Sequence, residues 1–384
     1  GHALGFGHNF ASSLNDFASV MEYPTPRVKV VAGKLDLSEA FEKQPGAYDD
    51  FMARYAYTPL AAAGEKAGLD AIIKDMRAKG ILYVPTTDPR WTWYDDRATP
   101  TENLAEAMAA RRIMLDTYGP QMLMPGEPIG SLRDARLWMA YLHHRYAIES
   151  GLKYVGGQFQ NIVVKGESLP PTEFIPVATQ RQVLGQLMEA ISPAGMALPE
   201  PLLAQLTADP GGNLEDLSKD AVFDQLRAAR ILAAQVLEPL FEADRAARMV
   251  ALAARDPNTL GFPEMVETVL ANSWNAKADA SVRDQALRRV SQRVALESMM
   301  ILGGKTDGSP DARAYILDTL ARLGESLKTR KSGDALTAAF YRQSARDIEK
   351  YLEDPVTNAP KSATSEWGDR PRSRFPLPPG PPLG

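Results

Sequence analysis

Three residues at the start of the chain have the types and spacing of a catalytic metal site. His2, Gly5 and His8 form the pattern His-x-x-Gly-x-x-His. Catalytic zinc takes three protein ligands, favours neutral imidazole and keeps one coordination position open for water. In the longer pattern H-E-x-x-H-x-x-G-x-x-H, the first two histidines share one face of a helix, and the glutamate acts as general base on the zinc-bound water.

The glycine of this pattern has a conformational reason. A glycine three residues after the second histidine can leave the helix in a left-handed turn, which brings the third histidine back to the metal. We therefore predict that His2 and His8 are the second and third zinc ligands and that Gly5 is the turn glycine. The first histidine and the glutamate would precede Gly1. This chain alone would then hold zinc weakly and be inactive or nearly so.

A methionine and a tyrosine follow the histidines within fifteen residues. The segment Ser19-x-Met21-x-Tyr23 resembles the methionine-containing turn that lies below the zinc in metzincins, in its astacin and serralysin form. The resemblance implies that Met21 supports the metal site and that Tyr23 is catalytic, stabilising the oxyanion of the tetrahedral intermediate. The interval between His8 and Met21 is short for a metzincin, so the loop between them must be compact.

The resemblance extends over essentially the whole chain, which is similar to a family of large bacterial zinc-dependent metalloproteases, secreted or periplasmic. The similar segments are His2–Ser13, Ser19–Pro24, Ala47–Asp49, His144–Tyr146, Val155–Gly157 and the Pro-rich end. The resemblance implies a hydrolase with a zinc cofactor, a peptide or protein substrate, and a periplasmic or secreted location.

Composition excludes several other classes of protein. Hydrophobic residues make up 45% of the chain and charged residues 24%, which is ordinary for a globular protein. The net charge of -5, with no basic stripe among aromatic residues, argues against nucleic-acid binding. The absence of cysteine excludes disulfides and thiolate zinc sites. No apolar run is long enough to span a membrane. The oligomeric state does not follow from the sequence.

The remaining patterns predict a mainly α chain with a large helical domain. The resemblance implies that the segment before this domain is the C-terminal part of a metzincin-like α/β metallopeptidase domain. We place the peptidase part at 1–98, the helical domain at 99–357 and a Pro-rich tail at 358–384. Short strands are expected at 28–31, 81–84 and 159–164. A helix is expected to begin at Ala47. Helical periodicity, caps and breakers predict further helices at 60–79, 99–118, 131–154, 179–191, 199–207, 221–254 with a break at Pro239, 263–271, 281–301, 310–329 and 334–352.

Two smaller features carry open alternatives. Asp88, Asp95 and Asp96 share a loop with Trp91, Trp93 and Tyr94, which is either a calcium site or, with greater weight, a capped surface loop. His143 and His144 are adjacent on a predicted helix. Adjacent helical residues point about 100° apart, so we expect one of these histidines to be buried and the other exposed.

A second functional class stays open beside the peptidase. The helical domain covers more than two-thirds of the chain and could be a non-catalytic binding or assembly module, with the metal site a remnant. An upstream sequence that lacks the His-Glu pair would favour this alternative.

Overall fold

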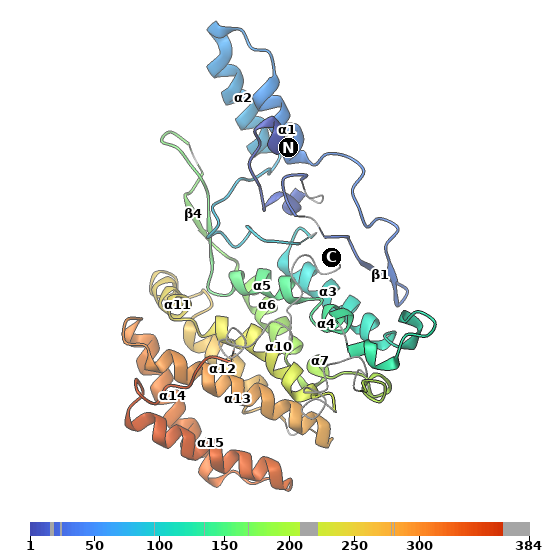
Figure 1. The fold of residues 1–384 in the computed structure, drawn as a ribbon. Helices are drawn as coiled ribbons and strands as arrows, with labels where there is room; N and C mark the ends of the chain where they lie inside the picture. Colours follow the sequence, from blue (N-terminus) through green and yellow to red (C-terminus); the bar gives the residue numbers. More distant parts are fainter. Residues whose placement is uncertain are drawn as a thin grey trace. The chain divides into compact units, whose positions relative to one another are not determined.

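The computed structural model describes residues 1–15, 19–23, 25–95, 97–133, 135–167, 169–207, 222–277, 279 and 281–363. The chain folds into two compact units, one of Gly1–Met114 with Met139–Ile175 and one of Leu115–Trp138 with Pro176–Leu377. Across the described ranges the chain is mostly helical, with two short antiparallel hairpins (Figure 1). The prediction of a mainly α chain is therefore confirmed, whereas the predicted domain division at 98 and 357 stays a prediction. Most of the predicted tail, from 364 onward, lies outside the described residues.

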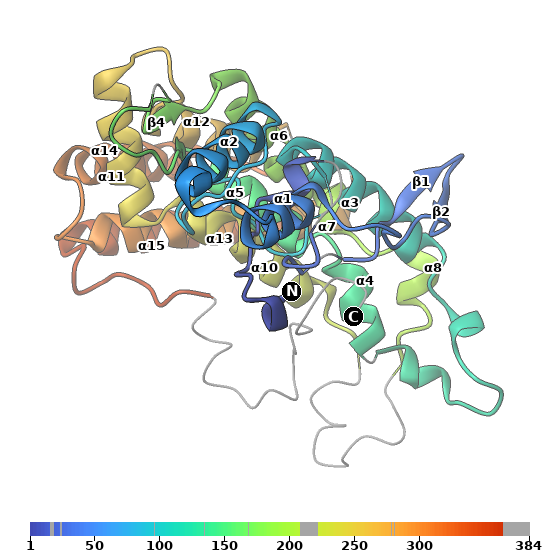
Figure 2. The same ribbon diagram turned by 90° about the horizontal axis from the view of Figure 1, so that it is seen from above.

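The first unit carries the predicted site residues. Its chain begins with short 3-10 turns at His2–Leu4 and Ser12–Asn15, and a hairpin follows in which β1 pairs antiparallel with β2 (Figure 2). The later elements of this unit include a second hairpin of β3 and β4. The bounds are β1 (Lys29–Val31), β2 (Lys34–Asp36), α1 (Ala47–Tyr57), α2 (Glu65–Ala78), α3 (Pro100–Asp116), α5 (Arg145–Tyr154), β3 (Gln158–Gln160) and β4 (Thr172–Phe174).

Local sequence signals account for the ends of these helices. α3 begins with Pro100 in its first turn, and the Thr99 side chain caps it by accepting a hydrogen bond from the Glu102 amide at 3.2 Å. α2 ends at Ala78, and Gly80 then takes a left-handed φ of 70° that stops the helix.

Two predicted elements of this unit are wrong. The described residues Ile81–Val84 pair with no other strand, and Ile81 packs instead into a small hydrophobic core. The long helix predicted over 131–154 is broken: α4 (Ala135–Tyr141) ends before His143 and His144, and α5 begins after them. Both histidines are buried, so the expectation of one exposed ring is also wrong.

The second unit is a set of packed helices. α13 packs against α10 and α14, and α14 packs in turn against α15. The predicted break at Pro239 is confirmed, because α10 ends one residue after this proline and α11 starts three residues later. The bounds are α6 (Val177–Ala190), α7 (Pro193–Met196), α8 (Glu200–Leu203), α10 (Gln225–Leu240), α11 (Ala243–Arg255), α12 (Phe262–Asn272), α13 (Val282–Gly304), α14 (Pro310–Thr329) and α15 (Ala335–Glu353).

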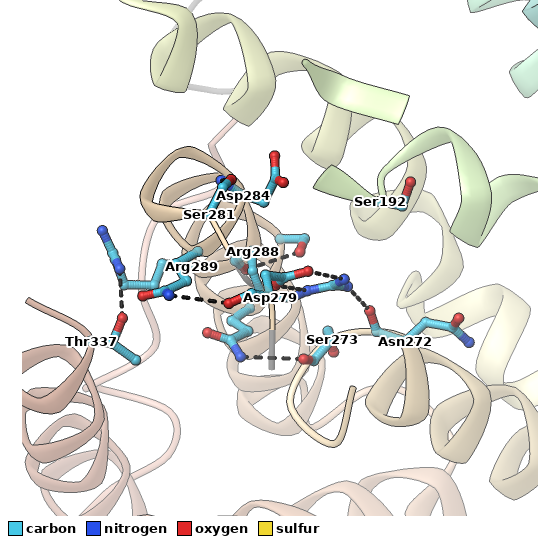
Figure 3. Close-up of polar contacts among 12 residues, drawn as sticks. Ser192, Asn272, Ser273, Asp279, Ser281, Asp284, Arg288, Arg289 and Thr337 are labelled. Carbon is cyan, nitrogen blue, oxygen red and sulfur yellow. Dashed lines mark hydrogen bonds and ion pairs between the residues drawn. The ribbon is translucent and has the colours of Figure 1, made fainter. Parts of the chain in front are cut away.

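Polar contacts at the start of α13 fix the connection from α12 (Figure 3). Ser281 caps the helix by accepting the Asp284 amide at 2.9 Å. Arg288 donates to both carboxylate oxygens of Asp279, at 3.0 and 3.2 Å, and also to the Asn272 carbonyl. One arginine on α13 thus holds both ends of the connecting loop. Among the described residues, no helix of either unit is long and apolar enough to cross a membrane.

Candidate metal centre

The structure brings the two predicted histidine ligands together. The His2 and His8 rings meet edge to face, and their Nε2 atoms lie 3.2 Å apart. Each Nδ1 donates a hydrogen bond at 2.9 Å to a backbone carbonyl, His2 to Phe6 and His8 to Met21. Because a carbonyl can only accept, each Nδ1 carries a proton, and Nε2 is the nitrogen of each ring that faces the shared position and can offer a lone pair to a ligand.

The spacing of these two nitrogens fits one metal ion. Zn–N bonds of 2.0–2.1 Å in tetrahedral geometry place two imidazole nitrogens about 3.3 Å apart. The Nε2–Nε2 distance of 3.2 Å between His2 and His8 agrees with this value. A backbone carbonyl on the opposite ring nitrogen is also the usual way in which proteins fix the tautomer of a metal-binding histidine. Within the described part of the chain, no group of three or more His, Asp or Glu side chains is arranged to hold a metal.

The turn between the histidines is made by Gly5. This residue has φ +83°, in the left-handed region, and its amide donates to the His2 carbonyl at 2.9 Å. Any other residue would be strained in this conformation. The reversal at Gly5 lets the His8 ring approach the His2 ring although five residues separate them in the sequence.

Met21 lies in a small core below the histidines. Its side chain is 2% exposed and packs with Phe6, Tyr48 and Ile81. A Cβ atom added at Gly1 would lie 1.8 Å from the Met21 sulfur, so only glycine fits at position 1 in this arrangement. The methionine sulfur therefore packs directly against the backbone next to His2.

A buried carboxylate holds the turn that contains Met21. Asp49, in the first turn of α1, accepts a short hydrogen bond from the Ser19 hydroxyl and a further one from the Val20 amide at 3.1 Å. It also accepts the Gly46 amide at 2.7 Å. The Ser19 hydroxyl in turn accepts the Met21 amide at 2.9 Å. The Met21 carbonyl accepts a hydrogen bond from His8 Nδ1. Asp49 therefore orients the His8 ring indirectly, through the Ser19 hydroxyl and the Met21 backbone.

Tyr23 completes the cluster around His8. Its hydroxyl lies 3.2 Å from His8 Nε2, the same nitrogen that faces His2. The Tyr23 ring packs edge to face against His8 and Phe10. A phenol with this placement can donate a hydrogen bond to an oxygen that develops negative charge near the two nitrogens.

The residue between Met21 and Tyr23 is a buried acid. Glu22 is 3% exposed, and its burial, assisted by the nearby Asp95 charge, raises the pKa of its carboxyl to about 10. The carboxyl is therefore protonated at neutral pH, and it adds no negative charge to the surroundings of the histidines.

The carboxylates Asp88 and Asp95, which were candidate calcium ligands, form hydrogen bonds within the protein instead. Asp88 is fully buried, and its carboxylate accepts hydrogen bonds from the backbone and guanidinium of Arg90 and from the Gln160 amide. Asp95 accepts a short hydrogen bond from the Thr92 hydroxyl. Asp96 lies outside the described residues. An arginine occupies the position where calcium would need oxygen ligands, so the structure does not support a calcium site at Asp88.

Asp49 and Glu22 were not predicted as site residues from the sequence. Asp49 lies thirty residues from Ser19, and its one signal was its position inside the family-like segment Ala47–Asp49. Glu22 sits in a polar position of the turn pattern, and nothing in the sequence distinguishes a buried acid from an exposed one there.

Comparison with known proteins gave one match. A family model described as Met-zincin matches residues 1–281, which include the histidine pair, the Met21 turn, the acidic loop and the first helices of the second unit. No curated protein and no solved structure matches the chain.

Proposed function

Because the chain belongs to the Met-zincin family, we propose that this protein is a zinc-dependent metalloendopeptidase in which His2 and His8 are two of three zinc ligands. Family membership supports a metallopeptidase in general, with zinc as cofactor and a peptide or protein as substrate. The finer assignment rests on the two Nε2 atoms 3.2 Å apart, each with a lone pair available. Neither the third zinc ligand nor the general base is assigned to a described residue of this chain.

Zinc in this site would supply a Lewis acid for the peptide carbonyl and a water of lowered pKa. The chain's own residues have three further tasks in the proposal. His2 and His8 hold the metal with tautomers fixed by the Phe6 and Met21 carbonyls. The Tyr23 hydroxyl donates to the oxyanion that forms at the substrate carbonyl. The buried Met21 side chain keeps the two histidine segments at a fixed separation.

The proposal includes a periplasmic or secreted location. It is supported by resemblance to a family of exported proteases, and a chain without cysteine is compatible with an oxidising compartment. Separating the culture medium, periplasm and cytoplasm of the source organism and probing each with an antibody tests this part. Detection in the cytoplasmic fraction alone would refute it.

Cleavage of casein and of fluorogenic peptides by the longer protein, with the residues before Gly1 included, tests the enzymatic proposal. We expect turnover that is lost on chelation of zinc and in His8→Ala. Tyr23→Phe should lower kcat by roughly 10- to 100-fold with little change in KM, because the hydroxyl acts mainly in the transition state. Tyr83→Phe is the matched control, since this tyrosine is 50% exposed and lies outside the cluster.

The alternative of a non-catalytic helical module predicts a different result. The longer protein would then cleave no substrate even with zinc bound, and the positions that precede Gly1 would lack the His-Glu pair. Either finding alone would reject a peptidase mechanism through these residues.

A further inference from the structure

We propose that the rings of Tyr23, Trp93 and Tyr94 form a binding surface for a large apolar or aromatic side chain of the peptide substrate, next to the bond that is cleaved. This inference rests on the proposed function and names the substrate class that the same site would prefer. Neither the family match nor the spacing of the histidines identifies this surface. Two of its three rings come from a loop about seventy residues after Met21 in the sequence.

The rings are continuous with the candidate metal centre. His8 stacks on Phe10 with ring centroids 5.1 Å apart, and Phe10 stacks on Trp93 at 5.1 Å with an interplanar angle of 7°. Tyr23 packs edge to face on Trp93 at 5.7 Å and stacks with Tyr94 at 6.0 Å. A side chain that contacts Trp93 would therefore lie one ring away from the hydroxyl that is proposed to serve the oxyanion.

The rings differ in solvent exposure, which distinguishes the ring that supports the surface from the rings that can contact a ligand. Phe10 is 4% exposed and lies below the cluster, whereas Tyr23 is 40% and Trp93 39% exposed. Phe10 covers one face of the Trp93 indole, so the exposed part of that side chain is available to a ligand. Exposed aromatic rings beside a reactive centre are typical contact points for ligands, since they offer a large apolar area at low entropic cost.

The loop that carries Trp93 is anchored to the histidine segment. The Thr92 amide donates to the Phe10 carbonyl at 2.9 Å, two residues after His8, and the Trp91 amide donates to the Asp88 carbonyl at 3.0 Å. Tyr94 takes a φ of +56°, which is costly for a residue with a bulky side chain and persists only where surrounding contacts impose it. The surface is thus preorganised and needs little rearrangement to bind a substrate.

The charges near the rings favour an apolar side chain over an acidic one. The Glu22 carboxyl is buried and protonated, and Asp95 is buried and bonded to Thr92. The ammonium of Lys153 is held over the Trp91 ring and donates to the Trp91 carbonyl. A carboxylate placed on Trp93 would lose hydration, and the only cation among these residues, Lys153, is already held at Trp91.

Binding of two matched peptides to the zinc-free chain tests this inference. Acetyl-Gly-Phe-Gly-amide and acetyl-Gly-Ala-Gly-amide are titrated while the tryptophan indole N–H resonances are followed by NMR, with the Trp93 signal assigned from Trp93→Phe. We expect the Phe peptide to shift the Trp93 signal and to bind at least about fivefold tighter than the Ala peptide. Trp93→Ala should abolish this preference, and Phe41→Ala should keep it, because Phe41 is 73% exposed and lies outside the ring cluster.

Equal binding of the two peptides, or a preference that survives Trp93→Ala, would overturn the inference. In the longer protein the ratio of kcat/KM for Phe over Ala substrates should also fall about tenfold in Trp93→Ala. The titration needs no zinc, so its failure is distinct from a failure of the proposed function. If the longer protein showed this preference but bound no zinc, the metallopeptidase assignment would be rejected and only the binding surface would remain.

Discussion

Replacement of Asp49 by Asn should weaken both the fold around the Met21 turn and the affinity for zinc. The Asp49 carboxylate accepts three hydrogen bonds, from the Ser19 hydroxyl and from the Val20 and Gly46 amides. Hydrogen bonds to a charged group contribute about 1.5–3 kcal/mol each. Asn keeps the volume but loses the charge and one acceptor oxygen. We therefore expect a loss of about 2–3 kcal/mol in the free energy of unfolding.

The effect on zinc follows from the position of His8. Its Nδ1 proton is held by the Met21 carbonyl, and loss of a partner behind a metal-binding histidine costs roughly 10- to 100-fold in metal affinity. We expect the dissociation constant for zinc to rise about tenfold in Asp49→Asn, at the lower end of this range, because Asp49 does not contact His8 directly. Asp50→Asn is the matched control, since Asp50 is exposed in the same helical turn and loses only the helix-dipole interaction.

Urea unfolding and calorimetric zinc titration of the three proteins provide the measurement. The reasoning would be refuted if Asp49→Asn and Asp50→Asn were equally stable and bound zinc equally well. In that case the turn would be held by packing around Met21 alone, and its hydrogen bonds would be incidental.

Three further predictions concern Glu22, His143 and Gly1 of the first unit. Burial raises the pKa of Glu22 to about 10, so the wild-type protein loses stability as pH rises from 4.5 toward that value. The free energy of unfolding of Glu22→Gln should therefore rise by on the order of 3 kcal/mol relative to wild type between pH 4.5 and pH 7. Urea unfolding at about pH 5 and about pH 8 shows whether the gap widens with pH, and a constant gap would contradict the assignment. Burial lowers the pKa of His143 to about 4, so its neutral form stabilises the fold above pH 6.5 and this stability is lost as pH falls through 4. His143→Gln should flatten that acid limb, and an unchanged limb would exclude His143 as a cause. Gly1→Ala should cost about 1–3 kcal/mol by displacing the Met21 sulfur, whereas Gly7→Ala, with no atom within 4 Å of the added Cβ, should be nearly neutral in thermal unfolding.

Local patterns predicted the approach of the two candidate histidines because these residues are close in sequence. The turn at Gly5 and the approach of His8 to His2 are set within seven residues, where the conformational freedom of glycine decides the path. Of the helices in the second unit, α13 and α14 were predicted to within three residues of their ends, and the structure places cap residues Ser281 and Ser309 at their starts. In both cases the physical cause acts within one helical turn. The helix predicted over 199–207 is shorter in the structure, where α8 covers Glu200–Leu203.

Contacts between distant residues were beyond the reach of these patterns. The bond from Asp49 to Ser19 and the stacking of Trp93 on Phe10 join segments thirty and eighty-three residues apart. The helix break at His143 and His144 contains no proline or glycine that would have predicted it. Both rings are buried, and the sequence pattern does not show this burial. Hydrophobic periodicity predicts the secondary structure of a segment, but it does not show which distant segment packs against it.

The coordination of zinc by His2 and His8 is tested most directly by NMR of the imidazole nitrogens. The chain has four histidines, of which His143 and His144 are buried and serve as internal controls. Zinc added to the ¹⁵N-labelled protein should shift the Nε2 signals of His2 and His8 together, with one ion per chain, and leave the other two unchanged. Signals of His2 and His8 that stay fixed, or that move no more than those of the buried pair, would contradict the account.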